Sequence, residues 1–105
     1  MDNCRKTIIL ILLEQTQASQ KELLELKCNN LIGIGREIDV IYPQRTVRIK
    51  NLTMKRQLMK WNRERIETDG CTALFLGIGK RQLMKDVKIV TNGKGIMFYR
   101  RQKLT

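Results

Sequence analysis

The sequence predicts a single α+β domain over residues 1–105, and four local patterns lead to this prediction. Apolar residues recur at helical spacing over 4–17, and a basic helical pattern covers 53–67. Apolar and basic residues alternate over 46–50, as they do in a half-buried strand. Two short apolar runs around an Asn-Gly pair then predict a β-hairpin over 87–99. The expected order is two N-terminal helices, a basic middle helix and a mostly antiparallel sheet that ends in a β-hairpin.

The first expected helix contains the six consecutive apolar residues Ile8–Leu13. A helix that is apolar around most of its circumference belongs in a core. The run is far shorter than the roughly 20 residues of a membrane span. It is also shorter than the apolar region of a signal peptide, which is about 7–15 residues long. We therefore expect a protein that is not secreted and has no membrane partner, located in the cytoplasm, or in the nucleoid or nucleus if its partner is there.

A second, short helix is expected over 20–26, because Ser19 and Glu22 have the spacing of a capping box. The next segment, 31–42, is ambiguous. Its apolar residues fit a helical stripe, but Gly33 and Gly35 weaken a helix by about 1 kcal/mol each. The β-branched residues within 38–41 favour a strand. Both alternatives stay open for this segment.

The second half of the chain provides the remaining elements. Thr53 is expected to cap the basic helix at its N-terminus. The apolar run 71–78 is expected to form a buried strand, and 80–85 a basic turn or strand. The hairpin over 87–99 completes the sheet.

Charge is strongly segregated along the chain. Residues 1–44 contain five Lys and Arg and six Asp and Glu, whereas 45–105 contain 16 and four. The whole excess of +11 therefore comes from the later part, which indicates a polyanionic partner because phosphates favour clustered cations. The candidate nucleic-acid-binding residues are Arg36, Arg48, Lys50, Lys55, Arg56, Lys60, Arg63, Lys80, Arg81, Lys85, Lys88, Asn92, Lys94, Arg100 and Arg101.

Residues 7–42 and the expected hairpin resemble the winged helix-turn-helix family. A Leu-rich first helix is followed by a short helix opened by a hydroxyl residue, and the matching positions are Ser19, Leu23, Ile34, Arg36, Ile38 and Ile41. The resemblance implies a recognition helix within 31–42 that presents Arg36. It also implies a wing over 87–99 with Asn92 and Lys94 at its tip. A DNA-binding regulator with a winged-helix-like fold would follow.

Catalytic chemistry is not expected. The chain has no His, the commonest general base and metal ligand, and no Gly-rich phosphate loop of the Walker type. Its three cysteines are widely separated and form no CxxC pair, so they are expected to be free, buried thiols. We predict no catalytic residue, no metal site and no cofactor.

The sequence thus predicts a non-enzymatic nucleic-acid-binding protein, a small DNA-binding regulator or accessory factor that grips phosphates with residues 48–103. DNA is favoured over RNA as the partner. One alternative stays open: a protein-protein interaction module or inhibitor whose basic face docks on an acidic partner protein. A homodimer also stays open.

Overall fold

The computed structural model describes residues 2–103, with side chains described for 4–99, and it confirms the α+β class. Its elements are α1 (Asp2–Thr16), α2 (Gln20–Glu25), the 3-10 turn η1 (Cys28–Asn30), β1 (Leu31–Ile34), β2 (Glu37–Tyr42), β3 (Arg45–Ile49), α3 (Leu52–Asp69), α4 (Lys80–Val90) and α5 (Ile96–Lys103). The chain divides into two compact units. One comprises the residues up to Leu24 together with those from Ile78 onward, and the other comprises Glu25–Gly77.

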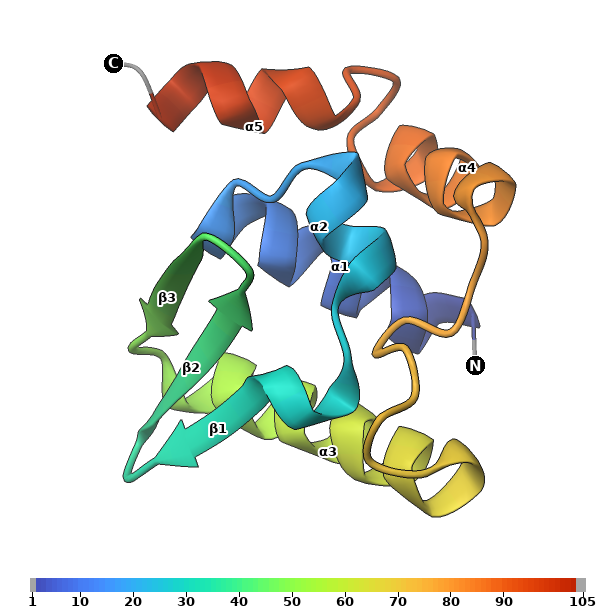
Figure 1. The fold of residues 1–105 in the computed structure, drawn as a ribbon. Coiled ribbons are helices and arrows are strands. Elements are labelled where there is room, and N and C mark those ends of the chain that lie inside the picture. The colour runs from blue at the N-terminus through green and yellow to red at the C-terminus, as the bar shows by residue number, and fades with distance from the viewer. Residues whose placement is uncertain (1, 104–105) are drawn as a thin grey trace. The chain divides into compact units, whose positions relative to one another are not determined.

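The unit Glu25–Gly77 is an antiparallel sheet in the order β1-β2-β3 with α3 on one face (Figure 1). Gly33 pairs with Ile38, and Ile38 pairs with Ile49, so the three residues share that face. A Cβ at Gly33 would lie 3.2 Å from the side chain of Lys55 on α3. Ile38 and Ile49 are buried there, and burial of such side chains contributes about 1.5–3 kcal/mol each.

The ambiguous segment 31–42 forms two strands, β1 and β2, joined by a tight turn at Gly35 and Arg36. Gly35 has φ +60°, a left-handed conformation that a glycine adopts without steric cost. Burial alternates residue by residue along β2, as expected for a strand with one covered face. The recognition helix implied for this segment is therefore corrected to a hairpin that presents Arg36 in its turn.

The predicted basic middle helix is confirmed as α3, but its cap is not Thr53. The side-chain oxygen of Asn51 accepts the backbone N–H of Met54 at 3.0 Å, so Asn51 is the N-cap. Asn and Thr both favour this position, which is why the sequence alone misplaced the cap by two residues. The helix ends before Gly70, whose φ of +94° stops helical geometry.

We expect Asn51→Ala to lower the free energy of unfolding by about 1 kcal/mol, because the Met54 N–H loses its side-chain acceptor. Thr53→Ala is the matched control, since Thr53 is exposed within the helix, and it should change stability by less than about 0.5 kcal/mol. Urea unfolding of the two variants measures the difference. A larger loss at Thr53 than at Asn51 would contradict this assignment of the cap.

The apolar run 71–78 is not the strand that its composition predicted. It forms an irregular segment in which Phe75 and Leu76 are buried. Its pairing is limited to an isolated bridge between Lys27 and Leu74, flanked by a 2.7 Å bond from the Phe75 N–H to the Leu26 carbonyl. The segment that contains Lys27 is followed directly by the 3-10 turn η1, so the two segments cannot form further β-bridges. The indole N–H of Trp61 on α3 donates to the Phe75 carbonyl at 2.6 Å and holds the segment in place.

The other unit contains both predicted N-terminal helices and the two C-terminal ones. The expected capping box is present: the Ser19 N–H donates to Glu22 Oε1 at 2.9 Å, and the Glu22 N–H donates to Ser19 Oγ at 3.1 Å. Helix α4 packs on α1, and α5 also contacts α1 (Figure 1). The packed faces include Leu12 of α1 and Leu83 and Val87 of α4, which are fully buried.

The predicted hairpin over 87–99 is wrong, and so is the basic turn or strand over 80–85. The chain forms α4, a turn and α5 instead, so residues 87–99 do not form the expected wing. The Gly93 N–H donates to the Lys88 carbonyl at 2.8 Å and the Asn92 N–H to the Ile89 carbonyl at 3.3 Å. These two bonds form a Schellman motif with Asn92 in the left-handed conformation at φ +54°. An Asn-Gly pair suits this helix cap and a hairpin turn equally well, because both need left-handed residues.

Candidate nucleic-acid interface

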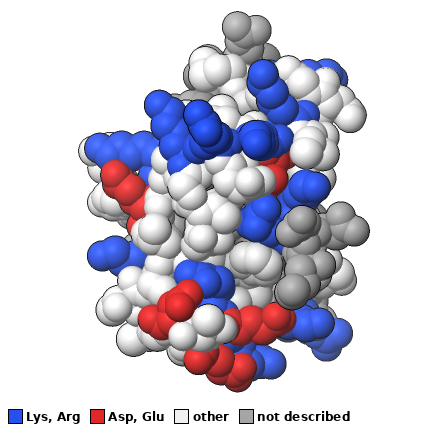
Figure 2. Space-filling model, turned by 90° about the vertical axis from the view of Figure 1, so that its right-hand side faces the viewer, with Lys and Arg blue, Asp and Glu red and all other residues white. Residues whose placement is uncertain are grey.

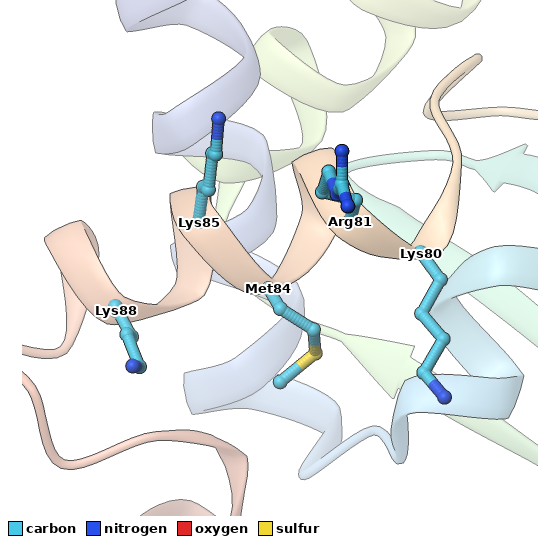
Figure 3. Close-up of a pocket in the computed structure, with 5 residues that line it drawn as sticks. All are labelled: Lys80, Arg81, Met84, Lys85 and Lys88. Atoms are coloured by element: carbon cyan, nitrogen blue, oxygen red, sulfur yellow. The ribbon is translucent and has the colours of Figure 1, made fainter.

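A strongly basic surface lies on α4. Its lining residues form a shallow, open pocket on one helix face: Lys80, Arg81, Met84, Lys85 and Lys88. We call these five residues the α4 basic face. In Figure 3, Arg81 and Lys85 extend to one side of the helix, whereas Lys80, Met84 and Lys88 extend to the other. At a rise of 1.5 Å per residue, the cations extend over about 12 Å along the helix axis.

The arrangement follows from the helical period of the sequence. Leu83 and Val87 are one turn apart and are fully buried. Arg81, Lys85 and Lys88 lie on the opposite side, where a 3.6-residue period directs them to solvent. Met84 lies at the border between the two sides, and Lys80 is exposed because it begins the helix. The segment 80–85, which the sequence predicted to be a basic turn or strand, is therefore part of a strongly amphipathic helix.

A buried acid fixes α4 against α1. Asp86 is only 1% exposed, and its Oδ2 accepts the Arg5 Nε–H at 2.7 Å. Its Oδ1 accepts a hydrogen bond from the Gln82 side-chain amide at 2.9 Å. A buried carboxylate is tolerated when it is paired and hydrogen-bonded in this way. The one acid of α4 is thus turned inward and neutralised, and the outer face keeps only positive charge.

The cations of this face are available to a ligand. Within the part of the chain that the structure describes, none of the four makes an ion pair or a side-chain hydrogen bond. Figure 2 shows Lys and Arg side chains gathered across the upper part of the molecule, at the level of α4 in Figure 1. Gly79 provides no side-chain cap, so the first N–H groups of the helix add partial positive charge next to Lys80 and Arg81. The α4 basic face is suited to binding a polyanion.

The basic residues of α3 form a second, weaker group. Arg56, Lys60 and Arg63 are exposed at helical spacing on one side of α3, as predicted. Glu64 and Glu67 are also exposed, and each lies four residues after one of these cations. Opposite charges at this spacing interact on a helix surface and reduce the local positive potential. This group is therefore a less suitable phosphate site than the α4 basic face.

Two other predicted residues of the same unit, Arg48 and Lys55, already contact protein groups. Arg48 forms a bidentate pair with Asp39, at 2.8 Å and 3.1 Å. The Lys55 ammonium donates to the Gly35 carbonyl. Arg36 is exposed in the turn between β1 and β2, and Lys50 is exposed directly after β3. Both are distant in the sequence from the α4 basic face. The hydrogen bond from Arg48 lowers the pKa of Asp39, and it also raises the pKa of Arg48.

The Arg48–Asp39 pair predicts a pH-dependent contribution to stability. Because the pKa of Asp39 is lowered in the folded state, the pair stabilises the protein above the ordinary Asp pKa of about 3.9. The contribution is lost as the pH falls through the lowered value. We expect Arg48→Gln to be less stable than the wild type near pH 7 and equally stable at strongly acidic pH. Urea unfolding across this range measures the gap, and a gap that widens on acidification would contradict the pairing.

The remaining predicted residues either have other roles or have side chains outside the residues that the structure describes. Asn92 caps α4, and the Lys94 ammonium lies 4.4 Å from the centre of the Phe98 ring, a cation–π contact. The side chains of Arg100 and Arg101 lie outside the described residues. Sequence reasoning missed Asp86 as the anchor and Met84 as a member of the face. Testing 80–90 for a 3.6-residue period would have indicated the helix and its inward-facing Asp86, but the pairing of Asp86 with Arg5 is seen only in the folded structure.

The expectation of three buried thiols holds only for Cys28, whose pKa is raised by burial. Cys4 and Cys71 are exposed, because they lie near a helix start and in a turn rather than in the core. Among the residues that the structure describes, no three His, Cys, Asp or Glu side chains are grouped to hold a metal ion. None of the described helices combines the length and apolarity needed to cross a membrane.

Comparison with known proteins gives no match: no protein-family model, no curated protein and no solved structure is similar to this chain.

Proposed function

We propose that this chain is a non-enzymatic nucleic-acid-binding protein, an accessory factor that binds phosphates through the α4 basic face. The observation that carries the proposal is the charge of this face: four exposed cations that form no ion pair with any described side chain, next to one acid, Asp86, which is buried against Arg5. Of residues 78–105, eight are Lys or Arg and one, Asp86, is acidic. A charge distribution of this kind raises the local concentration of polyanions and speeds their association.

Counterion release supplies the driving force. Each Lys or Arg that neutralises a phosphate releases a condensed cation from the nucleic acid, which is favourable at low salt. Four such contacts on B-form DNA give a dependence of log affinity on log salt with a slope of about −3.6. The compartment follows from the ligand: the protein would act in the cytoplasm or nucleoid, or in a nucleus, wherever nucleic acid is found.

Fluorescence anisotropy of a labelled DNA duplex at two salt concentrations tests the proposal. We expect saturable binding at about 50 mM salt and a loss of roughly a hundredfold in affinity at about 200 mM. Absence of binding at low salt, or binding that salt leaves unchanged, would contradict it. If an acidic protein copurifies in stoichiometric amount and nucleic acid does not bind, the face serves a protein partner instead.

A further inference from the structure

We infer that the α4 basic face binds the phosphate backbones of double-stranded DNA on both sides of the major groove, without reading base sequence. This inference rests on the proposed nucleic-acid-binding function and specifies its ligand.

The cations of α4 leave the helix in two directions. Arg81 and Lys85 form one row, one turn apart, and Lys80 and Lys88 form the other with Met84 between them (Figure 3). An α-helix with its side chains is about 10–12 Å wide. The major groove of B-form DNA is about 12 Å wide and admits a helix. A helix of this kind in the groove directs one row of cations toward each bordering phosphate strand.

The side chains of this face include no free amide or carboxylate group. Such groups distinguish base pairs by matching donors and acceptors on the base edges, and an Arg or Lys does so when it makes a bidentate contact with guanine. The amide of Gln82, the one amide residue of α4, is held by the buried Asp86. Three of the four cations are lysines, whose ammonium groups act as point charges, and only Arg81 has a planar fork. Contacts from such a face position a duplex but carry little sequence information.

Single strands and RNA duplexes fit this face poorly. Binding of single strands depends on exposed aromatic rings on which bases stack, and α4 contains none. The rings that follow it, Phe98 and Tyr99, pack edge-to-face on each other at 5.1 Å, and Lys94 covers Phe98. The major groove of an A-form RNA duplex is deep and too narrow for side chains to read. The ligand that matches the face is therefore a B-form duplex.

Competition binding with four probes tests the inference: two DNA duplexes of unrelated sequence, and the single-stranded DNA and the RNA duplex that correspond to the first. We expect the two DNA duplexes to compete within about threefold of each other, because a face that reads no bases lacks the penalty of a mismatched site. The single strand and the RNA duplex should compete at least about tenfold more weakly. Arg81→Lys should bind both DNA duplexes equally, because its contact is with phosphate.

The outcomes separate the two proposals. Binding that prefers one DNA duplex by more than about tenfold would overturn this inference and leave the nucleic-acid-binding function standing. Equal competition by the single strand or by the RNA duplex would do the same. A selective loss of one duplex in Arg81→Lys would show that Arg81 reads a base, which also overturns it. Failure to bind any of the four probes at low salt would overturn the function and the inference together.

Discussion

Replacing Asp86 with Ala should lower the free energy of unfolding by about 3 kcal/mol, the largest effect on stability that we expect from one substitution. The change removes the acceptor for Arg5 and for the Gln82 amide, and it leaves the guanidinium of Arg5 mostly buried without a counter-charge. Breaking such a buried pair costs far more than losing an exposed one, because the remaining charge stays desolvated. Thermal and urea unfolding of the variant measure the loss.

Asp69→Ala is the matched control for that experiment. Asp69 also pairs with an arginine, Arg65, at 2.5 Å, but it is 46% exposed. An exposed pair at this helical spacing contributes only about 0.3–0.5 kcal/mol. Equal losses in the two variants would contradict the view that Asp86 anchors α4. A stable Asp86→Ala variant with unchanged α-helical circular dichroism would contradict it as well.

Removing three cations from α4 should weaken the binding of a DNA duplex by roughly thirtyfold or more at about 50 mM salt. The variant is Arg81→Gln, Lys85→Gln and Lys88→Gln, which replaces exposed residues by another good helix former. Three counterions then stay on the DNA, and their release no longer favours the complex. Fluorescence anisotropy measures the affinity, and circular dichroism checks that the helix is retained.

The matched control for this variant removes three cations from α3, by Arg56→Gln, Lys60→Gln and Arg63→Gln. Both triple variants lose the same net charge, so a general electrostatic effect would weaken both equally. Because Glu64 and Glu67 already offset the α3 group, we expect its loss to change affinity by less than about threefold. A larger loss in the α3 variant than in the α4 variant would move the interface to the other unit.

The elements that the sequence predicted correctly are those whose signal is local. The apolar run Ile8–Leu13, the capping box of Ser19 and Glu22 and the alternation over 46–50 each determine an element within a few residues. The segment 31–42 could not be assigned in this way, because its apolar residues fit both periods. Pairing with β3, together with the left-handed Gly35, makes it a pair of strands.

The candidate site was only partly predictable from the sequence, because its geometry depends on contacts between residues that are distant in the chain. The excess of cations after residue 45 correctly indicated where positive charge lies along the chain, but not which cations share a face. The Asn-Gly pair misled because the left-handed conformation of Asn92 serves a helix cap as well as a hairpin. The partner of Asp86 is 81 residues earlier in the chain, at Arg5, so only the folded structure shows that the acid is buried and paired.

The central claim, that α4 holds phosphates, is tested most directly by the salt dependence of duplex binding in the wild type and in the α4 triple variant. The affinity of each protein is measured over a series of salt concentrations, and log affinity is plotted against log salt concentration. Loss of three phosphate contacts should make the slope shallower by about 2.7. Parallel lines for the two proteins would show that α4 holds no phosphates and would contradict the account.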